Sequence, residues 1–141
     1  ESSRVVRSLV HEKSLATSLD GWTAPLQLDG LIEINATGRD DLPLGRLEAE
    51  IRQEISAFLE TGPTRAELER SRRHLEVELY RGQMTVDGLA SRMGHDATVY
   101  RSPLRFQQLP DMVRKLSETQ VLEAARHAFK SEPAVIRSGK V

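Results

Sequence analysis

The sequence predicts an α+β fold in which an antiparallel sheet is covered on one side by several helices. Two strand patterns follow each other between residues 15 and 37, and a run of amphipathic helical patterns occupies residues 44–129. Strands and helices do not alternate strictly, which argues against a parallel sheet. Three predicted strands are few for so many helices, so we expect strands from a preceding segment to complete the sheet.

Length and composition fit one domain. The chain has 141 residues, of which 38% are hydrophobic and 29% are charged, the usual balance of a soluble globular protein. We therefore predict that residues 1–141 form a single domain fragment, ordered as a helix, two strands, a helical section and a final short strand. The helical pattern begins abruptly after Glu1, which indicates a fragment of a longer protein.

Charge and composition exclude several classes of function. The chain contains 20 Lys and Arg against 21 Asp and Glu, and only 4% aromatic residues, so we expect no nucleic-acid partner. Cysteine is absent, which excludes disulfides, thiolate catalysis and cysteine-based zinc sites. No apolar run approaches the roughly 18 residues that a membrane helix needs, so no membrane partner is expected either.

The first part of the chain contains the predicted hairpin. Apolar residues at helical spacing over residues 5–10 indicate a first helix that ends near Lys13. Residues 15–24 are rich in strand formers, and residues 31–37 alternate between two faces. The Asp-Gly pair at residues 29–30 is a turn signal, so an antiparallel pair is the simplest topology.

Two helices are predicted next. Apolar residues step by three or four over residues 44–59, and Gly62 is placed to end this helix. The capping-box pattern of residues 64–67 starts another helix, which extends to about Arg81. Leu89 and Met93 continue a helical face beyond two glycines, which weaken the pattern without necessarily ending it.

The last third of the chain is predicted to be mostly helical. A short segment around residues 104–109 precedes a turn of helix at residues 110–116. A second capping box at residues 117–120 starts a helix that extends to Phe129. Residues 133–137 have the composition of a last, short strand.

Histidines and acidic residues are the candidates for chemistry. The four histidines, none of which shares a helical face with another, are His11, His74, His95 and His127. His74 and Glu78, one turn apart, come nearest to a metal-binding pair, but a zinc site needs three or four ligands. We interpret them as part of a solvated face, and we expect no catalytic residue and no metal ligand in this chain.

The glutamates near this pair have an equally plain interpretation. They alternate at helical spacing with arginines, as intrahelical ion pairs do. General acid–base catalysis would require buried carboxylates with shifted pKa values. The alternating set comprises Glu67, Glu69, Glu76 and Glu78 with Arg65, Arg70, Arg72 and Arg73.

Four stretches of the chain together resemble the pitrilysin/insulinase-type zinc peptidases. Residues 3–18 are similar to that family's S-R-L-x-R-x-L-R-E-K-x-G-L-A-Y-S segment, and residues 30–36 resemble its G-L-F-x-I-x-A strand. Residues 62–71 are similar to its G-P-T-x-x-E-L-x-R-A junction, and residues 116–121 to its V-T-x-x-D-V helix start. Their order along the chain indicates the second half of one homologous domain, from the C-terminal region.

The resemblance implies paired homologous domains, each a sheet backed by helices, that enclose a chamber for the peptide. It also implies zinc in the parent protein, held by an H-x-x-E-H motif in the first half of the N-terminal domain. That motif is absent from this chain. The C-terminal domain of many bacterial members supplies an Arg and a Tyr to the substrate. His11 and Thr17 occupy the corresponding positions, with one residue fewer between them, so these two roles are not carried over.

Two functions follow as expectations. The chain is either the C-terminal portion of a bacterial zinc peptidase, where it helps enclose the peptide substrate, or part of a non-catalytic peptidase-like subunit that acts as an interaction partner. An unrelated small enzyme that uses His11 or His74 is a third hypothesis. Expected partners are the remainder of the parent chain, a homologous subunit, or a second copy joined through an exposed sheet edge. The expected compartment is the bacterial periplasm or cytoplasm.

Overall fold

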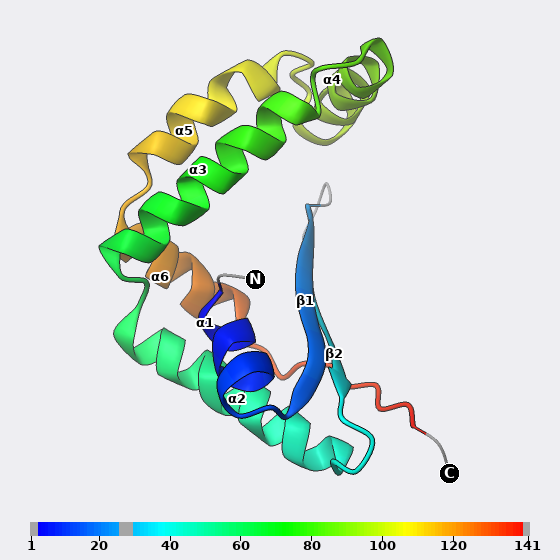
Figure 1. Cartoon of the computed structure of the whole chain (residues 1–141). Coiled ribbons are helices and arrows are strands. Elements are labelled where there is room, and N and C mark those ends of the chain that lie inside the picture. The colour runs from blue at the N-terminus through cyan, green and yellow to red at the C-terminus, as the bar shows by residue number, and fades with distance from the viewer. Residues whose placement is uncertain (1–2, 26–29, 140–141) are drawn as a thin grey trace. The chain divides into compact units, whose positions relative to one another are not determined.

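The computed structural model describes residues 3–25 and 30–139 and divides the chain into two compact units. The first unit comprises residues 1–24, 32–62 and 122–141, and the second comprises residues 25–31 and 63–121. Figure 1 shows the order of the elements along the chain. The α+β class with an antiparallel sheet, predicted from the sequence, is confirmed.

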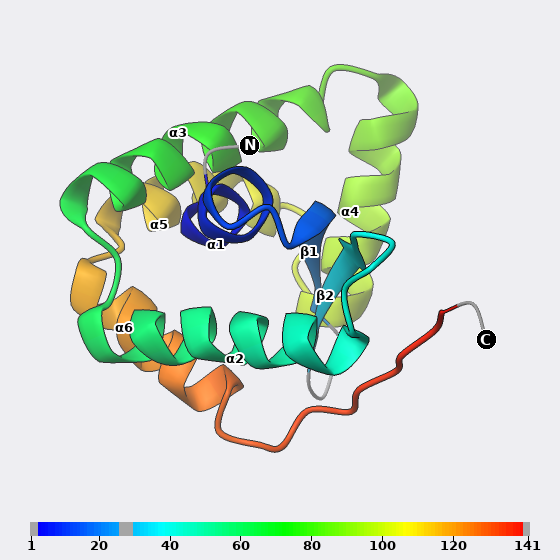
Figure 2. The same ribbon diagram turned by 60° about the horizontal axis from the view of Figure 1, so that its bottom comes forward.

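The first unit begins with a short helix whose hydrogen bonding changes along its length. α1 (Arg4–Val6) continues directly into a π-helical segment, η1 (Arg7–Glu12). Ser3 caps the start, because its hydroxyl accepts a hydrogen bond from the Val6 N–H at 3.2 Å. α2 (Leu44–Thr61) lies beside α1. Figure 2 shows α1 nearly end-on, with α2 running across the view.

The predicted strands pair as a two-stranded antiparallel sheet of β1 (Ala16–Pro25) and β2 (Gly30–Gly38). At the end near the helix, the Arg39 N–H donates to the Leu15 carbonyl at 3.2 Å, and the Thr17 hydroxyl donates to the Thr37 carbonyl at 3.2 Å. Of the predicted Asp-Gly turn, Asp29 lies outside the described residues.

The core of the first unit lies where η1, β1 and α2 meet. Its buried apolar side chains are Leu9, Ala16 and Leu47. Gly62 caps the C-terminal end of α2, as predicted, and its φ of 70° favours glycine because other residues are strained there. Arg4 fixes the start of α1 to this end of α2, since its guanidinium donates to the Thr61 hydroxyl at 3.0 Å.

The last predicted strand is wrong. Residues 133–137 are extended, but they form no β-ladder with any described residue. A strand forms only where its N–H and C=O groups lie beside those of a neighbouring strand, and this segment lies along neither edge of the described sheet. The segment is tied to α2 by side chains instead, with Arg137 Nε donating to Glu48 at 2.8 Å, while Ile136 is 94% exposed.

The second unit is helical. Both predicted capping boxes are confirmed: Thr64 and Glu67 exchange hydrogen bonds at 2.8 and 3.3 Å, and Ser117 and Gln120 do so at 2.9 and 3.2 Å. The helices are α3 (Arg65–Arg81), α4 (Val86–Tyr100), η2 (Arg105–Gln108), α5 (Leu109–Lys115) and α6 (Glu118–Ala128). The residues of α6 from Leu122 onward belong to the first unit.

α3 and α5 run side by side in Figure 1 and are joined by arginines. Arg72 on α3 donates to the Leu116 carbonyl at the end of α5. In the other direction, Arg114 Nε on α5 donates to Glu76 on α3 at 2.7 Å. Glu76 and Arg72, two members of the charged set identified in the sequence, therefore tie α3 to α5.

A break separates α3 from α4. It lies near the two glycines, Gly82 and Gly88, that weakened the helical pattern in the sequence. The Gly88 N–H donates to the Thr85 hydroxyl at 3.0 Å, which caps α4. Gly88 also comes so near the preceding turn that a Cβ atom would lie 2.4 Å from the Gly82 carbonyl oxygen. The turn therefore depends on the absence of a side chain at this position.

Gly88→Ala should lower the free energy of unfolding by about 1–3 kcal/mol, because the added methyl group collides with backbone. Gly94→Ala, also on α4 but with open space around its Cβ, is the matched control. It should raise stability by about 0.5–1 kcal/mol through helix propensity. Urea denaturation of both variants measures the difference, and equal stabilities would contradict this account of the turn.

Candidate functional site

The candidate site is the helix–strand junction, residues 11–17, which connects η1 to β1. It contains both positions at which the resembled family has its substrate-binding Arg and Tyr. Backbone hydrogen bonds hold its two sides, from the Lys13 N–H to the Ser8 carbonyl and from the Leu15 N–H to the Leu9 carbonyl, both at 2.8 Å. Ala16 follows as a fully buried residue.

The helix before the junction ends in a π turn. The bond between Ser8 and Lys13 spans five residues, one more than in an α-helix, so the turn between them is wider. π turns are rare in proteins, and many of those that occur lie at functional sites. Sequence reasoning missed this feature, because the apolar spacing of so short a segment does not distinguish an α-helix from a π-helix.

His11 and Thr17, the two positions singled out from the sequence, differ in whether their side-chain polar atoms are free to bind a ligand. His11 lies exposed on η1, and its ring makes no hydrogen bond or ion pair with any described residue. Thr17 is exposed on β1, but its hydroxyl donates to the Thr37 carbonyl. His11 therefore has free ring nitrogens for a ligand, whereas the Thr17 hydroxyl serves the hairpin.

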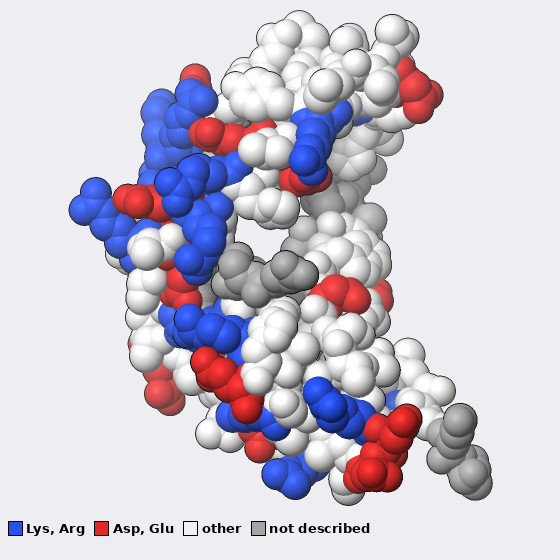
Figure 3. Space-filling model, in the orientation of Figure 1, with Lys and Arg blue, Asp and Glu red and all other residues white. Residues whose placement is uncertain are grey.

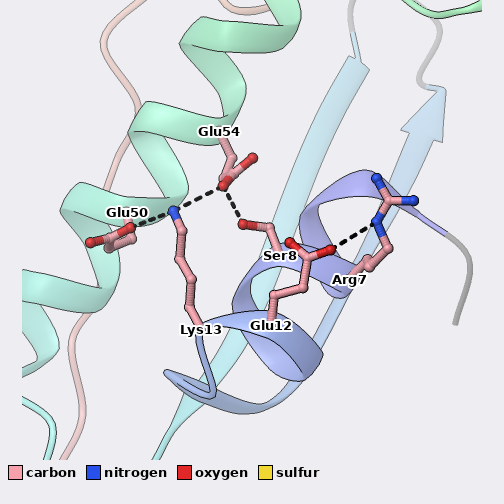
Figure 4. A network of polar contacts seen from close by, with 6 residues as sticks. All are labelled: Arg7, Ser8, Glu12, Lys13, Glu50 and Glu54. Carbon is pink, nitrogen blue, oxygen red and sulfur yellow. Dashed lines mark hydrogen bonds and ion pairs between the residues drawn. The ribbon is translucent and has the colours of Figure 1, made fainter.

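A polar network holds the π turn against α2 (Figure 4). Lys13 Nζ lies 2.8 Å from Glu50 Oε2 and 3.1 Å from Glu54 Oε1. The Ser8 hydroxyl donates to the same oxygen of Glu54. The Glu54 side chain is 14% exposed, so these hydrogen bonds form partly out of water, where they are stronger.

The network shifts the pKa values of its members in opposite directions. The hydrogen bond from Ser8, joined by that from Lys13, lowers the pKa of Glu54, while burial opposes the change. The hydrogen bonds to Glu50 and Glu54 raise the pKa of Lys13. Both shifts favour the charged forms, so Glu54 and Lys13 attract each other as ions at neutral pH.

The other candidate pair from the sequence belongs to α3 and lies far from this junction along the sequence. His74 and Glu78 are both exposed on α3, and Glu78 is paired with Arg81 at 3.1 Å. Among the described residues, no group of three or more His, Asp or Glu side chains could hold a metal ion. The donors described here therefore do not fit a zinc ion, which needs three or four ligands.

Sequence reasoning also missed a buried carboxylate on α4. Asp96 is fully buried, with its Oδ1 atom 3.1 Å from Arg92 Nε and 3.2 Å from His95 Nδ1. The spacing of four residues from Arg92 was the available signal. Tyr100 extends this cluster, because its ring stacks edge-on with His95 and lies under the Arg105 guanidinium.

Basic side chains gather over α3 in Figure 3, with acidic ones among them. A groove of about 350 Å³ lies between α3 and the start of α6. Its charged lining is mixed, with Arg65, Arg72 and Lys115 against Glu69 and Glu118. This mixture indicates no particular ligand. No described helix is long and apolar enough to span a membrane.

The junction contains a strained residue, Ser14, with a φ of 52°. Left-handed backbone costs a residue with a Cβ about 1–2 kcal/mol, and glycine avoids this cost but gains freedom in the unfolded chain. Ser14→Gly should therefore stabilise the protein by up to about 1 kcal/mol. The control Ser56→Gly, exposed on α2, should cost about 0.5 kcal/mol. Thermal denaturation separates the two, and destabilisation by Ser14→Gly would contradict the strain.

The lowered pKa of Glu54 predicts an acid-dependent contribution to stability. A carboxyl group whose pKa is lowered by folding stabilises the protein above its ordinary pKa of about 4.3, and this contribution disappears as the pH falls through the folded value. The difference in free energy of unfolding between the unsubstituted 141-residue chain and its Glu54→Gln variant should thus shrink in acid. Urea denaturation from pH 7 downward tests it, with the exposed Glu60→Gln as control. A difference that is constant with pH would contradict the prediction.

Comparisons with known proteins agree with this architecture. The family model described as the Peptidase M16 inactive domain matches residues 1–75. Among solved structures, the inactive peptidase domain of a protein described as a zinc protease from Bordetella parapertussis has a TM-score of 0.77 at 19% identity. The alignment covers 88% of this chain and 65% of that one. The comparison with curated proteins gave no match.

Two further structures share the fold. A protease from Helicobacter pylori has a TM-score of 0.76 at 19% identity, over 89% of this chain and 30% of that chain. The periplasmic protease PqqL from Escherichia coli has a TM-score of 0.71 at 15% identity, over 90% of this chain and 14% of that one. The chain thus spans only part of each of these proteins. With more than half of its residues matched by the family model, and the resemblance read from the sequence confirmed, the chain belongs to the inactive-domain family of the M16, or pitrilysin-type, peptidases.

Proposed function

We propose that the chain is the C-terminal portion of a bacterial zinc-dependent peptidase, where it helps enclose the peptide substrate while the zinc site lies in another domain. The observation that carries this proposal is the match of residues 1–75 to the inactive peptidase domain, because this stretch contains both the junction and the hairpin. The chain itself would supply surface and hydrogen bonds, and no chemical step.

The hairpin supports a role as part of a larger sheet. A two-stranded sheet is marginally stable alone in water. Four large apolar side chains of this hairpin, Trp22, Leu31, Ile32 and Ile34, are between 38% and 50% exposed. Residues 133–137 add an extended segment without a ladder partner among the described residues. We propose that the remainder of the parent chain, or a homologous subunit, supplies the missing strands.

The junction supports contact with a peptide. His11 is exposed and its ring nitrogens are free, so it is able to donate a hydrogen bond to a peptide carbonyl. It lacks the forked guanidinium that an Arg would present, so the contact would be a single hydrogen bond. Periplasm and cytoplasm are both compatible with this proposal; PqqL is described as periplasmic.

One observation favours a second candidate, a non-catalytic subunit that pairs with an active peptidase. The Thr17 hydroxyl serves the hairpin, and Thr has no phenol to reach a substrate. In such a subunit the junction would be free of substrate. A second copy joined at the sheet edge is the remaining arrangement that an unpaired hairpin allows.

Zinc content and peptide hydrolysis test the proposal, in the 141-residue chain and in the longest natural protein that contains it. After dialysis without chelator, elemental analysis should find near-stoichiometric zinc only in the longer protein, which should also cleave a fluorogenic peptide. His11→Ala there should raise KM by about threefold or more with kcat nearly unchanged, because a uniform binding contact is lost. His127→Ala, an exposed histidine on α6, is the control.

The alternatives give different results. Near-stoichiometric zinc in the 141-residue chain would overturn the proposal and direct attention to His74 and Glu78. A longer protein without zinc or hydrolysis, which instead copurifies with an active peptidase, would favour the non-catalytic subunit. An unchanged KM for His11→Ala in an active zinc protein would remove the junction from the substrate site.

A further inference from the structure

The carboxylate of Glu54 contacts both ends of the π turn. Its Oε1 atom accepts hydrogen bonds from the Ser8 hydroxyl and from Lys13 Nζ. Ser8 and Lys13 are also the two residues whose backbone groups close the turn, through the Lys13 N–H and the Ser8 carbonyl. One side chain of α2 therefore braces the same residues that define the wide turn, as Figure 4 shows.

Glu50 completes the arrangement one helical turn away on α2. Two carboxylates four residues apart on a helix repel each other unless a cation lies between them. Lys13 Nζ takes this place, within 2.8 Å of Glu50 and 3.1 Å of Glu54. Two carboxylates therefore hold the lysine, and its side chain is fixed against α2 more firmly than a single ion pair would fix it.

His11 belongs to the turn that Glu54 braces. It lies between Ser8 and Lys13 on η1, two residues before the lysine. An exposed histidine without other partners takes its place from its backbone, so the position of its ring follows the position of the turn. The turn in turn follows the contacts that hold it to α2.

We infer that Glu54 is a positioning residue, which together with Lys13 clamps the π turn of residues 8–13 to α2 and so sets where His11 stands. This inference rests on the proposed function, in which the junction faces the peptide. In this arrangement Glu54 and Lys13 act on peptide binding through the position of His11.

The same helix contains a matched control. Arg7 and Glu12 form an ion pair at 3.4 Å, with side chains 67% and 62% exposed. Pairs in water contribute little, because solvent and salt screen them. Arg7→Met removes a charge from the same turn without touching the contacts to α2, so it separates the clamp from a general effect of charge.

The experiment compares Glu54→Gln, Lys13→Met, the conservative Lys13→Arg and the control Arg7→Met. Hydrogen exchange of the Lys13 and Leu15 amides, measured in the 141-residue chain and in the longer protein, reports on the turn directly. Glu54→Gln and Lys13→Met should accelerate this exchange by about threefold or more, because the turn opens more readily. Lys13→Arg should restore slow exchange, and Arg7→Met should leave it unchanged.

Peptide hydrolysis by the longer protein supplies the second readout. Displacement of His11 should raise KM while kcat stays nearly constant, and Lys13→Arg should restore KM. Unchanged exchange in both Glu54→Gln and Lys13→Met, or equal effects of Arg7→Met, would overturn the clamp. Accelerated exchange with unchanged KM would keep the clamp and refute the proposed contact of the junction with peptide. If Glu54→Gln does not fold, the Lys13 variants still decide.

Discussion

The pairing of backbone N–H and C=O groups at the sheet is the constraint on which the rest of this structure depends. A strand satisfies its backbone by lying beside another, and a hairpin leaves one side of each strand unsatisfied. The described part of this chain contains a two-stranded sheet and several amphipathic helices. The partly exposed apolar side chains of the hairpin and the unpaired residues 133–137 both fit the proposal that further strands continue this sheet.

Most of the fold could be predicted from local signals. The capping boxes at Thr64 and Ser117 and the glycine at residue 62 act through their immediate neighbours, so the sequence alone locates these helix ends. The strand at residues 133–137 was predicted from composition, and it failed because a ladder requires a partner that composition does not supply. Strand identity depends on distant chain, whereas helix capping does not.

The sequence directed attention to the helix–strand junction, but it did not show how the junction is built. The resemblance located His11 and Thr17, and the structure shows that one is free and the other is engaged with Thr37. The π turn and the contact of Ser8 with Glu54 had no sequence signal, since the latter joins residues 46 positions apart. Asp96 was passed over because a lone Asp on a helix has the pattern of an exposed residue, and only packing shows that it is buried.

The sequence separation of these contacts bears on the order in which the chain folds. In the second unit, the capping contacts of α3 join residues three positions apart, and the contact of Arg114 with Glu76 joins residues 38 positions apart. In the first unit, the contacts of Arg126 with Leu59 and of Arg137 with Glu48 span 67 and 89 residues. Closing longer loops costs more chain entropy and slows folding. The helices of residues 63–121 are therefore placed to form early, and the contacts of α2 with the C-terminal part of the chain are placed to form later.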